Sequence, residues 1–338
     1  MKASLKNSGL EVGQMNVERL YAISKEVLDS ISEVYIGNRD VVRKTLAAAL
    51  VNGNVLFEDH PGLGKTLLAK AFGKALGLEY RRIQFTPDLL PADIIGTKVW
   101  RQNTGAFELV KGPIFTNVLL ADEINRAPPK TQSALLEAME ERQVTVEGDT
   151  LKLDEPFFVI ATQNPLEFEG TYPLPEAQLD RFALKMSVGY PGTLEDEVAI
   201  LEARLRWAKD DPTTDMEPVT DRETFLEMQA FVEHSVYIHP DVIRYIAELV
   251  RNARGDERVE AGPSPRGALT LLKISKANAA LSGRDFVIPD DVKEYALDAL
   301  AHRVVLKPEH AFEGVRGEDV IREALNKTPV PKGEMREE

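Results

Sequence analysis

The residues with the clearest chemical potential lie in the segment FEDHPGLGKTLLAKAF, at positions 57 to 72. Its Gly64-Lys65-Thr66 triplet matches the end of the phosphate-binding pattern GxxxxGK(S/T). In this pattern the N–H groups of a glycine-rich loop and the start of the next helix cradle phosphates. The lysine reaches the β and γ phosphates, and the hydroxyl binds Mg²⁺. We therefore predict that Lys65 and Thr66 hold ATP and Mg²⁺, although a glycine-rich turn without a ligand is the alternative interpretation.

The start of the same loop departs from the pattern, because Asp59 stands where the first glycine belongs. Aspartate tolerates unusual backbone angles better than most residues. The loop can keep its shape if this carboxylate points away from the phosphates, and we predict that it does. The apolar run NVLFE before the loop and the helical pattern KTLLAKAFGKAL after it supply the strand-to-helix context that the motif requires.

Polar side chains end two further predicted strands. In NVLLADEINRAP, Asp122 and Glu123 follow a buried run, where charge is costly unless a cation compensates it. We predict that Asp122 holds Mg²⁺ through its water shell and that Glu123 polarises the attacking water. In FFVIATQNP, Asn164 could touch both that water and the γ phosphate. A solvated strand end and a turn before a proline are the alternative interpretations.

Short β-rich runs alternate with helical patterns between residues 17 and 191, which predicts a mainly parallel sheet covered by helices. Two further segments, TKVWRQNTGAFELV and RQVTVEGDTLKLD, have the pattern of β-hairpins inserted into this domain. The predicted sheet strands are Asn54–Glu58, Tyr80–Phe85, Val118–Asp122, Phe157–Thr162 and Leu184–Gly189.

Beyond residue 191 the pattern becomes helical, and we place a domain boundary near Gly192. The predicted organisation is an N-terminal extension at 1–16, an α/β nucleotide-binding core at 17–191, a helical domain at 192–326 and a disordered tail at 327–338. The predicted helices are Leu194–Trp207, Arg222–His234, Pro240–Arg254, Pro265–Leu281 and Pro289–Leu306.

The composition narrows the classes of function. The chain has no cysteine, which excludes disulfides and thiolate metal sites, and its five histidines are scattered. A net charge of −14 and a pI of about 5.0 disfavour unspecific binding to nucleic acid or anionic lipid. Because we find neither a secretory signal nor an apolar stretch long enough to span a bilayer, we expect a soluble cytoplasmic protein.

Five segments together resemble the MoxR family of AAA+ ATPases, in the family's order and over residues 35 to 306. They are HPGLGKT, LLADEINRAPPKTQSALLEAMEE, ATQNP, GTYPLPEAQLDRF and SPRGALTLLKISKANAALSGR. In that family ED is a familiar form ahead of PGxGKT, so the resemblance treats Asp59 as a variant of the loop. The resemblance also implies a five-stranded parallel sheet of order 5-1-4-3-2, a helical lid domain and assembly into a ring, commonly of six subunits.

The resemblance gives Arg181 and Arg266 roles in the mechanism. Arg181 in LDRF resembles the finger that a neighbouring subunit inserts towards the γ phosphate, with Arg126 as a further candidate. The alternative for Arg181 is an ion pair within the chain, to Asp180 or Glu176.

Arg266 in SPRG resembles the lid arginine that senses the same phosphate. The residues themselves support a nearby anion, because Ser264 and Pro265 predict a helix N-terminus, where the charge of Arg266 opposes the helix dipole. An acidic side chain is the alternative partner.

The segment YIGNRDVV lies where AAA+ proteins wrap the adenine, so the resemblance implies contacts to the base there. An apolar pair that simply packs in the core is the alternative. The full set of expected nucleotide contacts is Tyr35, Ile36, Gly37, Pro61, Gly62, Leu63, Gly64, Lys65, Thr66, Leu67 and Arg266.

The implied function is a ring-forming, magnesium-dependent ATPase that remodels or activates partner proteins, often ones with von Willebrand factor A domains. The two hairpins would project into the pore or towards a client, unless Trp100 and Phe107 pack onto the domain. One alternative function is a nucleic-acid motor like the minichromosome maintenance helicases, which share both hairpins. Lys98 and Arg101 in the hairpins favour this alternative, whereas the net charge of the chain disfavours it. The other is an ATP-gated scaffold with little turnover, which the presence of Glu123 and Asn164 disfavours.

Overall fold

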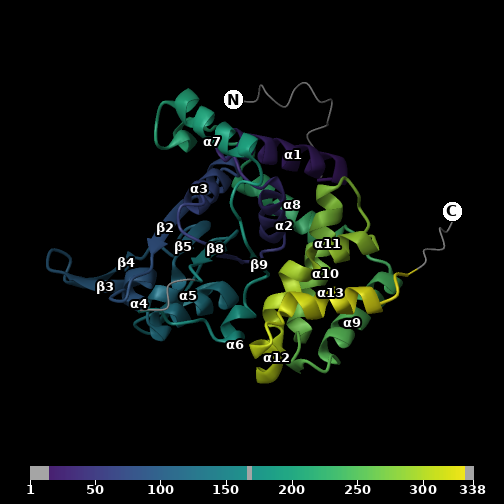
Figure 1. Cartoon of the computed structure of the whole chain (residues 1–338). Helices are drawn as coiled ribbons and strands as arrows, with labels where there is room; N and C mark the ends of the chain where they lie inside the picture. Colours follow the sequence, from purple (N-terminus) through teal and green to yellow (C-terminus); the bar gives the residue numbers. More distant parts are fainter. Residues whose placement is uncertain (1–14, 166–169, 332–338) are drawn as a thin grey trace.

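The computed structural model describes residues 15–165 and 170–331. They form an α/β core followed by a helical lid (Figure 1). The chain is still folded where we placed the start of the tail, because the last helix ends at Lys327 and Thr328 is buried. The predicted N-terminal extension up to residue 14, and the predicted tail from residue 332, lie outside the described residues.

A five-stranded parallel sheet forms the centre of the core. Its order is β2-β5-β8-β1-β9, and all four neighbouring pairs run parallel. Numbered along the chain as sheet strands one to five, this order is 5-1-4-3-2, so the expected topology is confirmed. The strands are β1 (Val55–Glu58), β2 (Tyr80–Gln84), β5 (Val118–Asp122), β8 (Phe158–Gln163) and β9 (Leu184–Met186).

Both faces of the sheet are buried at β1, β5 and β8, as their nearly continuous apolar residues predict. On one face Leu120 and Ile160 join a core shared with the lid and with the helices α1 and α3. On the other, Leu119 and Val159 pack with α4 and α5. The helices of the core are α1 (Val17–Val34), α2 (Arg39–Leu50), α3 (Lys65–Ala75), α4 (Pro91–Ile95), α5 (Pro129–Glu141) and the short α6 (Glu176–Leu179).

The first predicted hairpin consists of β3 (Gly96–Arg101) and β4 (Ala106–Lys111) and extends away from the core at the left of Figure 1. Trp100 and Phe107 lie opposite each other on the two strands. Their rings meet edge to face with centroids 5.2 Å apart, yet the residues stay 52% and 64% exposed. They therefore pack against each other rather than onto the domain.

The second predicted hairpin, β6 (Gln143–Val146) with β7 (Asp149–Lys152), lies next to the first. Lys98 forms an ion pair of 2.6 Å with Asp149 across the two hairpins, and Arg101 pairs with Glu108 at 3.1 Å within the first. Both cations that would suit a nucleic-acid contact thus already face carboxylates.

The lid contains seven α-helices in its described residues. Four of them, α9, α10, α11 and α12, start with a proline in the first turn, where its fixed φ suits a helix and its missing N–H costs nothing. The helices are α7 (Leu194–Trp207), α8 (Arg222–His234), α9 (Pro240–Arg254), α10 (Pro265–Leu281), α11 (Pro289–Leu300), α12 (Pro308–Phe312) and α13 (Gly317–Lys327). No described helix is long and apolar enough to cross a membrane.

Two elements end earlier in the structure than we predicted from the sequence. The helix predicted to reach Leu306 stops at Leu300, and β11 (Val305–Leu306) pairs antiparallel with β10 (Val259–Ala261). The chain leaves the helix because it turns there to bring Arg303 against the core. The strand predicted to reach Gly189 stops at Met186, because the next three residues turn to bind Asp59.

A polar junction joins the core to the lid. The side chain of Arg303 is 2% exposed and its Nε donates to Asp180 Oδ1 at 2.6 Å. Its remaining donors reach the carbonyl oxygens of Asp180, Phe182 and Ala299. Beside it, His302 Nε2 lies 3.1 Å from the Phe182 carbonyl oxygen, and its Nδ1 is buried. Burial, and secondarily the charge of Arg303, lowers the pKa of His302 well below its usual value.

This pKa predicts a loss of stability in weak acid. An unfolded chain protonates His302 near pH 6.5, whereas the folded protein keeps it neutral. The contribution of neutral His302 to the free energy of unfolding is therefore fully present above about pH 6.5. Below that pH the free energy of unfolding decreases by up to about 1.4 kcal/mol per pH unit, until the pKa of His302 in the folded protein is reached. Thermal melts at pH 7.5 and 5.5 should show a smaller loss for His302→Gln, which can still donate to the Phe182 carbonyl. His234→Gln, at an exposed site, should behave like the parent. Equal losses in all three proteins would contradict the assignment.

Candidate nucleotide site

The phosphate-binding loop connects β1 to α3, which begins at Lys65. Gly62 and Gly64 have φ angles of 87° and 76°, a conformation that residues with a Cβ rarely adopt. The loop and the ends of three strands surround an open pocket of about 300 Å³. The pocket is lined by Asp59, Pro61, Gly62, Leu63, Gly64, Lys65, Thr66, Arg82, Gln84, Asp122, Glu123, Thr162, Gln163 and Asn164.

The ammonium group of Lys65 lies across the loop. Its Nζ donates to the carbonyl oxygens of Asp59 at 3.0 Å and His60 at 2.9 Å. Burial lowers the pKa of Lys65, while the nearby charges of Asp59, Asp122 and Glu123 oppose that shift. A phosphate in the pocket could replace the two carbonyl oxygens, since an anion satisfies this buried cation better than neutral acceptors do.

The Asp59 carboxylate turns towards the segment after β9, where both of its oxygens accept hydrogen bonds, while the residue also lines the phosphate pocket. It accepts hydrogen bonds from Ser187 Oγ at 2.6 Å, Val188 N at 2.6 Å and Gly189 N at 3.3 Å. The residue is only 5% exposed. In this fold an aspartate therefore ties the loop to the strand that leads into the lid, a connection that glycine could not make.

Asp59→Asn should separate this structural role from nucleotide binding. One carboxylate oxygen becomes an NH₂ group facing N–H donors, so we expect the unfolding free energy to fall by about 1–3 kcal/mol. The affinity for ATP should change less than about threefold, or roughly 0.7 kcal/mol. Denaturant melts and fluorescent-nucleotide titration measure the two quantities. A hundredfold gain in affinity would show instead that the carboxylate repels the nucleotide.

The two acidic residues at the end of β5 are each held by neighbouring side chains. Asp122 Oδ1 accepts from Thr162 Oγ1 at 2.7 Å, and Oδ2 accepts from Arg82 at 2.7 Å. Glu123 Oε2 accepts from Gln84 Nε2 at 2.7 Å and pairs with Arg126 at 3.0 Å. Glu123 itself has a left-handed backbone, with φ 57°. This turn separates the two carboxylates, so that they meet different partners.

Arg82, Gln84 and Thr162 were missed by the sequence reasoning. A signal existed, because the alternation in β2 puts Arg82 and Gln84 on one face, and parallel pairing sets Gln84 beside Asp122. Thr162 likewise lies on β8, shortly before Asn164, which follows the strand. Asn164 is 8% exposed and lines the same pocket.

The residues expected to contact the base line a second pocket of about 710 Å³, which shares the residues from Pro61 to Gly64 with the first. Tyr35, Ile36 and Gly37 lie on one side of it. Burial, and secondarily the charge of Asp59, raises the pKa of Tyr35 to about 12. The phenol is therefore neutral and can line an apolar pocket. Leu67 lies on the loop side, and residues of α7 complete the lining.

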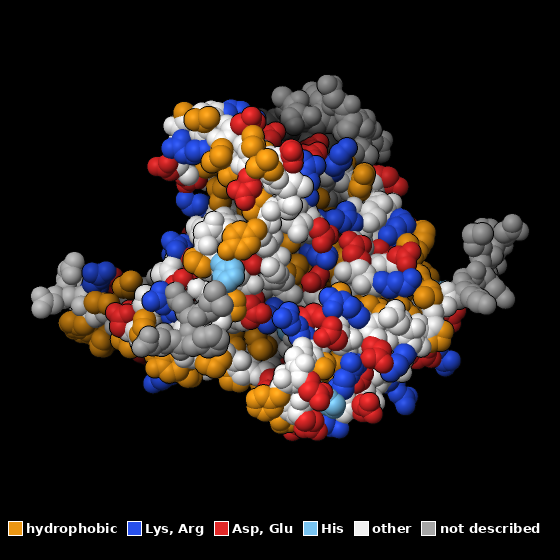
Figure 2. All heavy atoms as spheres, in the orientation of Figure 1, with side chains coloured by type: hydrophobic (Ala, Val, Ile, Leu, Met, Phe, Trp, Pro, Cys, Tyr) orange, Lys and Arg blue, Asp and Glu red, His pale blue; other side chains and the backbone are white. Residues whose placement is uncertain are grey.

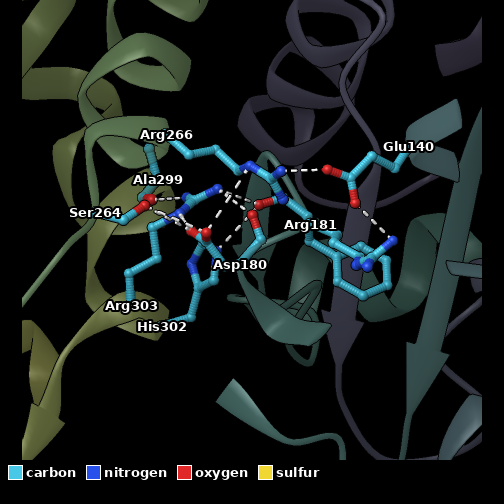
Figure 3. A network of polar contacts seen from close by, with 9 residues as sticks. Glu140, Asp180, Arg181, Ser264, Arg266, Ala299, His302 and Arg303 are labelled. Atoms are coloured by element: carbon cyan, nitrogen blue, oxygen red, sulfur yellow. Dashed lines mark hydrogen bonds and ion pairs between the residues drawn. The ribbon is translucent and has the colours of Figure 1, made fainter. Parts of the chain in front are cut away.

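The structure places Arg181 and Arg266 elsewhere, in a separate pocket of about 340 Å³ at the core–lid junction (Figure 3). We expected Arg266 to contact the nucleotide, but the structure does not place it at the phosphate-binding loop of the same chain. Arg181 donates to the Leu136 carbonyl oxygen at 2.7 Å and pairs with Glu140 at 2.7 Å. Its acidic partner is Glu140 rather than the Asp180 or Glu176 suggested by the sequence. Arg266 pairs with the same Glu140 and lies 3.9 Å from Asp180.

Comparisons with known proteins agree with this geometry. Residues 54–184 match the family described as "ATPase family associated with various cellular activities (AAA)", and residues 251–324 match an AAA lid domain. The fold and the loop therefore define an AAA-type ATPase.

Relatives that match over most of the chain identify the family within the AAA-type ATPases. An uncharacterised Bacillus subtilis protein, YeaC, is 47% identical over 93% of this chain and 97% of its own length. Chaperone MoxR1 of Mycobacterium tuberculosis is 39% identical over 89% of this chain and 81% of its own. A solved structure from Cytophaga hutchinsonii, of a protein provisionally assigned as an ATPase, is 39% identical with a TM-score of 0.86 and covers 94% of this chain and 97% of that one. The chain belongs to the MoxR family of AAA+ ATPases.

Proposed function

We propose that this protein is a magnesium-dependent ATPase that works as a ring, commonly of six copies, and uses hydrolysis to remodel or activate partner proteins. The observation that carries the proposal is the pocket in which the loop meets the polar ends of β5 and β8. It combines a lysine, a hydroxyl, two carboxylates and an amide at the carboxyl edge of a parallel sheet, where α/β proteins bind ligands.

Each residue of the pocket has a role that follows from its position. Lys65 would exchange its carbonyl partners for the β and γ phosphates, and the ribose and base would extend into the larger pocket beside Tyr35. Thr66 and Asp122 would hold Mg²⁺ together with phosphate and water. This sharing is consistent with the described residues, which contain no group of three or more acidic or histidine side chains able to hold a metal alone. When bound, Mg²⁺ neutralises the charge that develops on the phosphates.

Glu123 would orient the attacking water, helped by Asn164. Its present partners, Gln84 and Arg126, hold the carboxylate in place at the pocket edge. We infer that this arrangement keeps Glu123 oriented until the water is bound.

The position of the arginines supports the proposed assembly. Arg181 and Arg266 lie at a junction pocket that shares no lining residue with the phosphate pocket, so a phosphate within their reach would belong to another copy. A head-to-tail ring brings one face of each copy against a different face of the next and places such residues at a shared site.

The surface of α7 is consistent with this assembly. Leu194, Leu201 and Leu205 are 73%, 67% and 80% exposed and lie on one stripe of the helix. Figure 2 shows apolar side chains gathered over α7, beside the larger nucleotide pocket that this helix helps to line. We infer that a neighbouring copy covers this stripe.

A protein client fits the exposed hairpin better than nucleic acid does. Trp100 and Phe107 offer an apolar contact, whereas Lys98 and Arg101 are paired with carboxylates. The name of the relative chaperone MoxR1 supports a client that is a protein. We propose a partner with a von Willebrand factor A domain, to be tested by co-purification.

Two substitutions separate binding from hydrolysis. Lys65→Ala should abolish ATP binding, because it removes the cation that faces the phosphates. Glu123→Gln keeps its shape and should bind ATP normally while hydrolysis falls at least about a hundredfold, as expected for loss of a residue that activates water. Fluorescent-nucleotide titration and phosphate release measure these effects. Parent-rate hydrolysis by Glu123→Gln would show that another residue orients the water.

Mixing tests the trans role of Arg181. Arg181→Ala should bind ATP nearly normally and hydrolyse about 10³ to 10⁵ times more slowly. Glu123→Gln is also inactive but retains the finger, so a mixed ring contains sites with both Glu123 and a neighbour's Arg181. Activity should return on mixing labelled subunits that demonstrably exchange. If it stays at the level of the separate variants, Arg181 does not act in trans and Arg126 is the next residue to test.

A further inference from the structure

One carboxylate at the core–lid junction contacts both arginines. Glu140, in the last turn of α5, pairs through Oε2 with Arg181 at 2.7 Å and through Oε1 with Arg266 (Figure 3). Arg181 belongs to the core and follows α6, whereas Arg266 lies in the first turn of α10 in the lid. Glu140 therefore holds together two guanidinium groups that come from different domains.

Stability does not account for this arrangement. The side chains of Glu140, Arg181 and Arg266 are 34%, 31% and 44% exposed, and ion pairs at such positions contribute little to folding. The buried bonds of Arg303 to Asp180 already join lid and core. The effect that remains for Glu140 is geometric: it sets the separation and direction of two like charges that would otherwise repel each other.

The geometry leaves both arginines able to bind a phosphate. A guanidinium carries five N–H donors in a planar fork. Within the residues that the structure describes, Arg181 makes its polar contacts through NH1, so its Nε and NH2 donors stay available. Arg266 meets Glu140 through NH2 and has a further NH1 group. One carboxylate thus restrains both side chains without occupying their full donor sets.

We propose that Glu140 is a positioning residue that holds Arg181 and Arg266 side by side, so that both reach the nucleotide of the neighbouring subunit together. This inference rests on the proposed function, since it requires a shared site. Fixed donors cost no reorganisation when charge develops on the phosphate, which is why their alignment affects the rate more than the affinity. Because Arg266 moves with the lid and Arg181 with the core, the pair is aligned when the two domains are docked as they are here.

Glu140→Ala and Glu140→Gln test the role, with Glu141→Gln as the matched control on the next residue of α5. Within the described residues Glu141 makes no ion pair or side-chain hydrogen bond. For the Glu140 variants we expect ATP affinity within about twofold of the parent, a Tm within about 3 °C and a kcat lowered about tenfold or more. Glu140→Asp, which keeps the charge on a shorter stem, should restore part of kcat, and Glu141→Gln should match the parent. A parent-like kcat in both Glu140 variants overturns the proposal.

Complementation distinguishes positioning from a general structural defect. A Glu140→Ala subunit keeps its own nucleotide site, so mixing with Glu123→Gln should give more activity than the average of the two separate proteins. Mixing with Arg181→Ala should give no gain, because both defects lie on the same face. If mixing Glu140→Ala with Arg181→Ala raises the ATPase activity, or if mixing it with Glu123→Gln does not, the proposed role of Glu140 is wrong. If Arg181→Ala and Glu123→Gln also fail to complement each other after exchange, the shared site itself is wrong and both proposals fall; if they succeed, the failure concerns Glu140 alone.

Discussion

The relation between the two domains depends on the buried guanidinium of Arg303. A buried cation is costly unless its donors are paired, and here the carboxylate and backbone of Asp180, together with the carbonyl oxygens of Phe182 and Ala299, accept from it. Asp180 precedes Arg181 directly, and Ser264 Oγ, at the start of α10, also lies 3.3 Å from its carboxylate. One ion pair therefore fixes the neighbourhood of both arginines of the junction, one in each domain.

A second carboxylate connects the phosphate-binding loop to the core segment that leads into the lid. Asp59 accepts from three donors directly after β9, shortly before α7 begins. Lys65 in turn bonds the backbone oxygen of Asp59. A phosphate that takes Lys65 away from that oxygen acts on a residue already attached to the strand leading into the lid. This chain of contacts is a physical route by which nucleotide could change the position of the lid.

The sequence predicted the features that short segments determine. The loop is recognisable from Gly64, Lys65 and Thr66, and the sheet edge from the change of apolar to polar residues at Asp122 and Asn164. The order of the strands came from the family resemblance and not from periodicity, because buried parallel strands look alike and pattern alone does not rank them.

Side-chain pairs between distant segments could not be predicted in the same way. Glu140 and Arg266 are 126 residues apart, and their meeting depends on how α5, α10 and the turn after α11 pack. The predicted helix to Leu306 failed for a related reason, since local propensity continues the helix and a tertiary bond of Arg303 ends it. Long-range polar contacts thus decided both the correct partner of Arg181 and the true end of α11.

The apolar stripe on α7 has a consequence for how the isolated chain responds to temperature. Leu194, Leu201 and Leu205 are exposed in the single chain, so any partner that covers them removes apolar surface from water. Such burial carries a negative heat-capacity change and is driven by entropy near room temperature. An association through this helix would therefore weaken on cooling, so a preparation kept cold would favour the separate chains.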